Sequence, residues 1–404
     1  MYIFLFITLY FQILLLVSFF EKQEEKGGGA IGRKISYLST TIIVPCYNEE
    51  STVQKTIDSL LQLHYPIDQY TILVIDDGST DGTWSVLQQY AGHKNITLLQ
   101  KENEGSKYAA LNFALQHVDS ELVGVLDADS WVDPDALVHY MPILGDSEVM
   151  AVIPSMVVAN PDSFFRKAQK AEYDMGLFAR KALYNMNSLY ITPGPFSVFR
   201  KDVFDSLGPY QEAHHTEDAE IALRLQKHGH KIAYSEKSIV YTVGPKTIRP
   251  LIKQRIRWVY GFLRNVFDYR DLLFKKEYGP LGMVVLPMGV FRVFISVILF
   301  PLSLWLIILP IFRFFQKIVL VGFDSSLLFS FDWFFVSTDS ITLITAIGFI
   351  LSMVTLWLGR DLIEEPYKIT VHVLHMLCMY TFIAPIWLIT SSYNALFSRK
   401  GTWR

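Results

Sequence analysis

Three acidic clusters and one basic cluster follow one another along this chain. They are Asp76-Asp77, Asp127-Ala128-Asp129, Glu217-Asp218 and Gln254-Arg255-Ile256-Arg257-Trp258. Carboxylates bind hard divalent cations and remove protons from hydroxyl groups, whereas a guanidinium binds phosphate. The set therefore contains the groups needed to hold a nucleotide diphosphate through a metal, deprotonate an acceptor and neutralise a departing phosphate.

The first acidic pair, Asp76-Asp77, follows the apolar run 71–75 and opens a segment rich in Asp and Gly. A plain turn would explain either residue taken singly. Two adjacent carboxylates repel each other, however, and a protein that keeps both has a nearby cation or hydrogen-bond donors for them. A base imide and ribose hydroxyls are such donors, so we expect Asp76 and Asp77 to contact a nucleotide.

The second cluster, Asp127-Ala128-Asp129, also follows an apolar run, at 122–126. On an extended segment, alternate residues project to the same side, so both carboxylates would face one ligand. Mg²⁺ or Mn²⁺ binds through one or two carboxylates and takes its other ligands from water and phosphate. We therefore expect this pair of carboxylates to bind such a metal, although a solvated turn is the alternative for so short a pattern.

The third cluster, Glu217-Asp218, precedes an amphipathic segment at 219–227. One interpretation is structural: Thr216 would cap a helix, and the acidic residues would lie favourably at its positive end. The functional interpretation makes Asp218 the general base for an acceptor hydroxyl, with Glu217 beside the substrate. The upstream pair His214-His215 suggests metal ligands, but no third partner stands at suitable spacing.

The basic cluster places three side chains on one face of a helix, since Gln254, Arg257 and Trp258 are spaced i, i+3 and i+4. An Arg fork matches a diphosphate bidentately, and an indole face stacks against a sugar. A basic helix at a membrane surface is a second interpretation that is compatible with the first, because other residues of the segment suit anionic headgroups: Lys253, Arg255, Tyr260, Phe262 and Arg264.

The elements expected to position these residues alternate between strands and helices. Strands are expected at 41–45, 70–75, 96–99, 121–126 and 149–158, and helical stripes near 53–61 and 111–118. Such alternation predicts an α/β fold with a mostly parallel sheet, in which ligands collect beyond the carboxyl ends of the strands. The glycine-rich turn of dinucleotide-binding folds is missing after the first strand, where residues 44–49 stand.

The composition places this domain between membrane segments. Of the 404 residues, 51% are hydrophobic and 19% charged, and the charges are nearly absent from 2–20, 282–312, 341–358 and 369–390. Basic residues follow the first segment and none precedes it, which predicts a cytoplasmic domain. The run 282–312 is long enough for a tight hairpin, giving five spans in total. The net charge of −3 favours no nucleic-acid partner, and two cysteines provide no disulfide framework.

We therefore predict five regions. A transmembrane anchor occupies 1–20, a linker 21–39, a cytoplasmic catalytic domain that ends in an interfacial basic helix 40–280, a transmembrane region 281–397, and a basic tail 398–404. The expected location is the plasma membrane, crossed several times.

These motifs together resemble the processive members of glycosyltransferase family 2, the group of cellulose, hyaluronan, chitin and poly-N-acetylglucosamine synthases, over about 40–261. The resemblance implies a GT-A nucleotide-sugar fold. It implies that Asp76 and Asp77 hold uridine, Asp129 ligates the metal and Asp218 is the base. Further binding roles would fall to the Q-x-x-R-W residues already named, and to Pro45, Tyr47, Asn48, Glu49 and Lys107. The loop Pro193-Gly194-Pro195-Phe196-Ser197 occupies the place of the family's acceptor pocket.

The expected activity is inverting transfer of a sugar, such as N-acetylglucosamine or glucose, from a UDP-sugar to a growing β-linked polysaccharide. Mg²⁺ or Mn²⁺ is the expected cofactor, and the expected partners are a saccharide or lipid-linked acceptor, the lipid bilayer and accessory export subunits. Two alternatives stay open: transfer of one sugar to a lipid acceptor, and a catalytically silent sugar-binding component.

Overall fold

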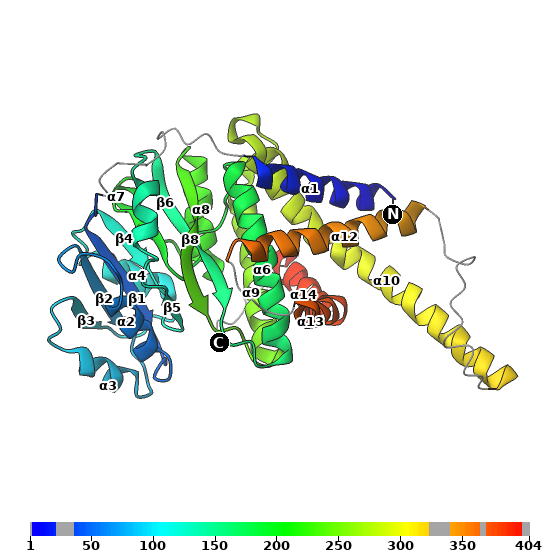
Figure 1. Cartoon of the computed structure of the whole chain (residues 1–404), viewed down its shortest axis with the longest axis horizontal. Coiled ribbons are helices and arrows are strands. Elements are labelled where there is room, and N and C mark those ends of the chain that lie inside the picture. The colour runs from blue at the N-terminus through cyan, green and yellow to red at the C-terminus, as the bar shows by residue number, and fades with distance from the viewer. Residues whose placement is uncertain (1, 22–35, 323–339, 364–368, 398–404) are drawn as a thin grey trace.

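The computed structural model describes residues 2–21, 36–322, 340–363 and 369–397 (Figure 1). Most of the predicted linker and the predicted basic tail lie outside the described residues. The described chain forms one mixed α/β domain, from which apolar helices extend to one side (Figure 1).

The sheet contains eight strands in the order β3-β2-β1-β4-β7-β6-β8-β5. Their bounds are β1 Thr40–Cys46, β2 Tyr70–Asp76, β3 Ile96–Gln100, β4 Leu122–Val125, β5 Ser130–Val132, β6 Val149–Val158, β7 Ser197–Arg200 and β8 Lys231–Thr242. All five strands expected from the sequence are confirmed. The expectation of a mostly parallel sheet is only half right, because β7 pairs antiparallel with β4 and β6, and β5 pairs antiparallel with β8.

The described helices lie on both faces of this sheet and beyond it. They are α1 Tyr2–Phe20, α2 Val53–Leu61, α3 Thr83–Leu87, α4 Lys107–Leu115, α5 Met141–Leu144, α6 Phe164–Asn185, α7 Asp202–Leu207, α8 Glu217–Lys227, α9 Ile248–Asp268, α10 Leu286–Val321, α12 Ser340–Asp361, α13 Ile369–Phe382 and α14 Ala384–Leu396. Short 3₁₀ turns stand at Gln88–Tyr90, Val138–Tyr140, Ala213–His215, Arg270–Leu272 and Lys276–Tyr278, and a π-helical turn at Leu281–Val285.

Alternate residues of the strands feed two separate cores. In β1, Ile42 and Val44 face a core shared with α2, whereas Ile43 faces a second core shared with α4. Because successive side chains of a strand point to opposite faces, each face of the sheet needs its own cover of helices. The predicted arrangement of helices on both sides of the sheet is therefore confirmed.

Helices α6 and α9 lie between the sheet and the apolar helices (Figure 1). Helices α1, α12 and α13 pack on α6, and α14 packs on α9. The approach of α12 to α6 is close at Gly359, where an added Cβ atom would lie 1.9 Å from the carbonyl oxygen of Asp174. The element that carries the Q-x-x-R-W motif, α9, is thus in direct contact with the apolar helices.

Two described helical segments are long and apolar enough to cross a membrane, Leu281–Pro301 and Thr342–Asp361. A third span results if the pair His372–Phe382 and Ala384–Leu396, bent by 44°, counts as one. The apolar part of α1, Phe4–Phe20, is shorter than these. The hairpin expected at 282–312 is wrong: α10 runs unbroken through Pro301 and Pro310, because each proline costs one local backbone hydrogen bond without reversing the chain.

Candidate active site

The carboxyl ends of β1, β2 and β4 meet at one edge of the sheet, and three of the predicted motifs lie there. Asp76 is the last residue of β2 and is fully buried. Its Oδ1 accepts a hydrogen bond from the Ser79 amide at 3.2 Å, and its Oδ2 accepts one from Gln100 Nε2 at 2.8 Å. Asp76 therefore holds the following turn against β3, and both its oxygens are already engaged within the protein.

Asp77 is paired with a cation that the sequence analysis missed. Lys101 Nζ lies 2.9 Å from Asp77 Oδ1, with both side chains less than 10% exposed. Burial raises the pKa of Asp77, and Lys101 offsets part of that effect. The sequence already contained a clue to this pair, because Lys101 stands two residues after the third expected strand and is therefore close to the same edge of the sheet.

The loop after β1 is held by the loop after β2. Asn48 has a left-handed backbone with φ of 56°, and its Oδ1 accepts a hydrogen bond from the Thr80 amide at 2.8 Å. The amide of Asn48 donates to Ser79 Oγ at 2.9 Å. The Glu49 carboxylate accepts a hydrogen bond from Thr52 Oγ1 at 2.7 Å. Its charge also raises the pKa of Asp129. Pro45 and Tyr47, the other residues expected in this loop, are both partly exposed.

The Asp127-x-Asp129 segment is a turn rather than the extended stretch that we expected. The Ser130 amide donates to the carbonyl oxygen of Asp127 at 3.0 Å, which closes the turn. The carboxylates of Asp127 and Glu49 still lie close enough to Asp129 to act on it. Together with burial, they raise the pKa of Asp129 to about 7. One oxygen of Asp129 accepts from Ser130 Oγ at 3.1 Å.

Lys107, the first residue of α4, joins the second and third acidic clusters. Its Nζ forms an ion pair with Asp127 and lies 3.6 Å from Glu217 Oε1. Burial by itself lowers the pKa of Lys107, but the two carboxylates outweigh it and the pKa lies above its ordinary value. A Cβ atom at Gly194 would lie 2.6 Å from Lys107 Nζ and 2.8 Å from Asp127 Oδ2, so a larger residue there would displace this ion pair.

Asp218 lies in the first turn of α8, beside the loop that contains Gly194. Thr192 donates to the carbonyl oxygen of Asp218 through its amide at 3.0 Å and its hydroxyl at 2.8 Å. Burial and the neighbouring Glu217 raise the pKa of Asp218 to about 7, although Lys107 and Arg257 act against this rise. The structural interpretation is right in part: Thr216 is the N-cap residue and acidic residues fill the first turn of α8, but the Thr216 hydroxyl donates to the carbonyl of Ala213 and makes no capping hydrogen bond.

Helix α9 brings the basic motif to the same site. The two arginines of the motif, Arg255 and Arg257, have different surroundings. The charge of Arg257 acts on both Asp218 and His215. Arg255 instead forms two hydrogen bonds with Glu172 of α6, at 2.7 and 2.8 Å, and its guanidinium lies 4.5 Å from the ring centre of Trp258. Part of the interfacial interpretation is thus wrong, because Arg255 and Tyr260 are buried in protein.

The other motif residues complete the description. Gln254 Oε1 is buried without a hydrogen-bond partner in the described part of the chain. His214 Nε2 pairs with Asp268 at 2.7 Å, and the described residues contain no group of three His, Cys, Asp or Glu side chains able to hold a metal. The alternative that His214 and His215 bind a metal therefore has no geometric support in the described residues.

Gly261 sets the distance between α9 and the start of α8. A Cβ atom there would lie 2.1 Å from Thr216 Oγ1 and 2.5 Å from its Cγ2. Asn265, one turn later on α9, donates to the same Thr216 Oγ1 at 2.9 Å. The helix that carries Arg257 is therefore locked against the residues just before Asp218.

The donor set fits one divalent cation. Asp129 keeps one carboxylate oxygen that accepts no hydrogen bond from the described residues, and Asp127 and Glu49 add negative charge beside it. With no third protein ligand in those segments, a cation would take its remaining ligands from water and phosphate oxygens, as Mg²⁺ and Mn²⁺ commonly do.

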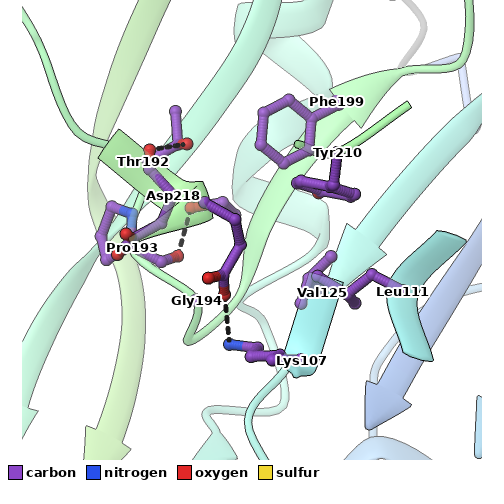
Figure 2. Close-up of a pocket in the computed structure, with 11 residues that line it drawn as sticks. Lys107, Leu111, Val125, Thr192, Pro193, Gly194, Phe199, Tyr210 and Asp218 are labelled. Atoms are coloured by element: carbon purple, nitrogen blue, oxygen red, sulfur yellow. Dashed lines mark hydrogen bonds and ion pairs between the residues drawn. The ribbon is translucent and has the colours of Figure 1, made fainter. Parts of the chain in front are cut away.

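A small cavity of about 10 Å³ lies where these groups converge (Figure 2). Lys107, Glu217 and Asp218 line it together with the loop residues Pro193 and Gly194. Figure 2 shows Lys107 at one end of this cavity and the aromatic rings of Phe199 and Tyr210 at the other. The space holds about one water-sized molecule, so a sugar ring needs room beyond this cavity.

The family model described as glycosyltransferase like family 2 matches residues 39–261. The chain belongs to this family. The resemblance inferred from the motifs is confirmed, and so is the GT-A-like fold class, here with a mixed sheet and flanking apolar helices.

Curated relatives include two activities. A β-monoglucosyldiacylglycerol synthase of Nostoc sp. is 30% identical over 243 residues, which are 59% of this chain and 52% of that protein. A poly-β-1,6-N-acetyl-D-glucosamine synthase of Staphylococcus epidermidis is 29% identical over 223 residues, 55% of this chain and 54% of that protein. The chain thus spans about half the length of the curated relatives it matches.

Among solved structures, the mannosyltransferase PcManGT of Pyrobaculum calidifontis, in complex with GDP-Man and Mn²⁺, matches with a TM-score of 0.61. The match is 18% identical and covers 97% of this chain and 95% of that one. At this identity the match supports the fold alone.

Proposed function

We propose that this protein is a membrane-embedded, inverting glycosyltransferase that transfers a sugar from a UDP-sugar to a growing β-linked polysaccharide. The observation that supports the proposal is the convergence of Lys107, Glu217 and Asp218 at one cavity, with Asp127 paired to Lys107 and the charge of Arg257 acting on Asp218. A proton acceptor, a cationic clamp and a guanidinium are the three groups that a single displacement at an anomeric carbon needs.

Asp218 is the proposed base. Thr192 holds its backbone from one side, and Glu217 and burial keep its pKa near 7, which suits a carboxylate that takes a proton at neutral pH. The acceptor hydroxyl transfers its proton to Asp218 as its oxygen bonds to the anomeric carbon. The bond to the diphosphate breaks in the same step, so the configuration of that carbon inverts.

Lys107 and Arg257 are the proposed cationic groups of the donor site. Lys107 is held by Asp127 and Glu217, so its ammonium is already in place before substrate arrives. Arg257 acts from α9 on the carboxylate of Asp218 and would bind the diphosphate, with Gln254 and Trp258 on the same helical face. A divalent ion held by Asp129 would neutralise charge on the departing diphosphate.

The nucleotide would lie between the loops after β1 and β2. Of the adjacent pair, Asp77 with its Lys101 partner is 6% exposed, whereas Asp76 is fully buried and supports the loop from inside. Tyr47, Asn48 and Glu49 border the same space from the first loop. The proposed uridine contacts are therefore Asp77 and this loop, with Asp76 acting through the turn that it holds.

Transfer of one sugar to a lipid acceptor is the second candidate, and a specific observation favours it. The Nostoc relative matches this chain as well as the polysaccharide synthases do and is described as making a glucosylated diacylglycerol. The contact of α9 with α14 places the acceptor side of the site next to apolar helices, where either a lipid or an emerging polymer has access.

The proposed location is the plasma membrane, with the catalytic domain on the cytoplasmic side and several crossings. Apolar helices flank the domain, and their exposed side chains include Ile298, Trp305 and Phe349, each at least half exposed in the isolated chain. Accessory export subunits would be needed only in the polysaccharide case.

One experiment tests the proposal and separates its two versions. Purified full-length protein in detergent is incubated with a panel of UDP-sugars and Mn²⁺ or Mg²⁺, with and without diacylglycerol, and both UDP release and product size are measured. Polymer supports the first version, and a single glycolipid supports the second. Absence of UDP release with every donor would refute both and favour a silent sugar-binding protein.

Asp218→Asn and Asp119→Asn form the matched pair for this assay. Both remove a carboxylate charge at nearly constant size, but Asp119 is exposed and lies outside the site. The proposal expects Asp218→Asn to abolish transfer while UDP still binds, and Asp119→Asn to behave like the unmodified protein.

A further inference from the structure

A second, larger cavity of about 410 Å³ lies outside the groups described above. Its lining comes from the catalytic domain and from the first part of the bent helix pair: Lys55, Trp131, Val158, Ala159, Asn160, Pro161, Lys170, Tyr241 and His372. A volume of this size is typical of sites for small molecules. Three of these residues are basic or titrate near neutrality, and none is acidic.

The aromatic residues of this cavity are not arranged as a platform for a sugar ring. Lys55 Nζ lies 3.0 Å from the ring centre of Trp131, and Tyr241 stacks on Trp131 with ring centres 5.9 Å apart and planes 20° apart. The indole therefore already has two partners. Its effect is to hold the Lys55 ammonium in place through a cation–π contact.

The charge of the cavity is positive. Lys170 is only 3% exposed and lies 3.7 Å from Asp174, which balances its charge. Lys55 is exposed and has no carboxylate partner within ion-pair distance in the described part of the chain, and His372 adds charge when it is protonated. Together with the amide of Asn160, these side chains offer several hydrogen-bond donors to one anion.

The position of His372 connects this cavity to the lipid phase. It lies in the first turn of α13, which begins at Ile369 and forms a bent apolar pair with α14. Beyond it, Leu374, Phe382 and Ile386 are 58%, 62% and 48% exposed, as expected of side chains that face hydrocarbon. The donors of the cavity thus lie at the polar end of an apolar helix, where lipid headgroups are found.

We propose that this cavity binds the phosphate group of a phospholipid headgroup. A phosphate offers three acceptor oxygens to the ammonium, amide and imidazole donors, and the remaining volume accommodates the glycerol part of the headgroup. The lipid tails then lie along α13. This inference does not depend on the proposed function, because none of the lining residues belongs to the catalytic set.

The test uses the full-length protein in dodecyl maltoside, a detergent without phosphate, and measures binding by calorimetry. The probes are dihexanoyl phosphatidic acid, dihexanoylglycerol and inorganic phosphate. The proposal expects saturable binding of the phosphatidic acid, at least tenfold weaker binding of the other two probes, and no displacement of the lipid by UDP. Equal affinity for dihexanoylglycerol would show that only tails are recognised, and equal affinity for inorganic phosphate would show a soluble anion as the ligand; either result overturns the lipid assignment.

Variants connect the binding to this cavity. Lys55→Gln combined with His372→Gln is expected to weaken the phosphatidic acid at least tenfold, whereas Lys237→Gln, which removes an exposed charge from β8, leaves it unchanged. Asp218→Asn should retain binding, which separates this site from catalysis. A melting temperature within the range of the unmodified protein confirms that the double variant is folded. Unchanged affinity in that folded variant would overturn the proposal.

Discussion

Replacement of Gly261 by alanine tests whether the approach of α9 to α8 positions the site. The new Cβ atom would lie 2.1 Å from Thr216 Oγ1, 2.5 Å from Cγ2 and 2.9 Å from Cβ. Thr216 cannot turn away without cost, because its hydroxyl donates to Ala213 at 3.1 Å and accepts from Asn265 at 2.9 Å. Either α9 or the start of α8 must therefore move by about 1 Å.

The expected magnitude follows from that displacement. Overpacking of a buried contact costs about 1–3 kcal/mol of stability. A shift of about 1 Å between Arg257 and Asp218 is expected to lower the transfer rate about 100-fold, since catalytic groups tolerate little misplacement. The assays are UDP release under saturating donor and thermal unfolding of the detergent-solubilised protein.

The control is a second helical glycine that has space around it. At Gly176 of α6, a Cβ atom would meet only Arg180 Nη1, at 3.6 Å. Gly176→Ala should keep full activity and gain up to about 1 kcal/mol from helix propensity. Comparable losses in the two glycine variants would refute the role of the α8–α9 contact.

A double variant separates the clash from other effects. Thr216→Ala removes the two nearest atoms, so Thr216→Ala combined with Gly261→Ala should recover part of the activity that Gly261→Ala alone loses. Full activity and an unchanged melting temperature in Gly261→Ala would refute the reasoning outright, as would a double variant worse than the sum of its parts.

Five further expectations concern pH and four substitutions. Transfer should fall about tenfold per pH unit below about pH 7, because Asp218 must be unprotonated and its pKa is raised to about 7; a flat profile down to pH 5.5 would contradict its role as base. The same raised pKa means that the folded state holds the proton more tightly than the unfolded chain, so stability is lost as pH rises toward 7, and Asp218→Asn should raise the melting temperature at pH 8 but not at pH 4. Asp129→Asn should raise the Mn²⁺ concentration needed for half-maximal UDP release at least tenfold, measured after removal of metal with EDTA. Glu172→Gln should cost about 3 kcal/mol in unfolding experiments, since it leaves Arg255 charged and without its carboxylate partner. Gly194→Ala should raise the donor KM severalfold in steady-state assays, because its Cβ atom meets both members of the Lys107–Asp127 pair.

Much of the fold was predictable from local pattern. The runs of β-branched residues in β1, β2 and β6 are long enough to signal strands without tertiary information. Strand β8 was missed although it has twelve residues, because the polar residues 235–238 interrupt its apolar pattern. Also missed were β5 and β7, which have only three and four residues and whose pairing partners are distant in sequence. Those two strands decide the topology, since their antiparallel pairing makes the sheet mixed.

The roles of neighbouring residues were less predictable than the motifs themselves. The sequence places Asp76 beside Asp77 and Arg255 near Arg257, but it contains no sign of which member faces the site. Burial decides the first pair, because Asp76 is sealed by Ser79 and Gln100. Helix packing decides the second, because Glu172 of α6 captures Arg255 and leaves Arg257 toward Asp218.

The sequence by itself determined the family, the order of acidic and basic groups and the edge of the sheet to which they belong, because strand ends and side-chain chemistry are local properties. Only the tertiary structure decided that Lys107 joins two acidic clusters, that glycines at 194 and 261 set the spacing, and that a basic cavity opens beside His372. Those features arise from contacts between segments that are 20 or more residues apart, for which neither periodicity nor spacing carries a signal.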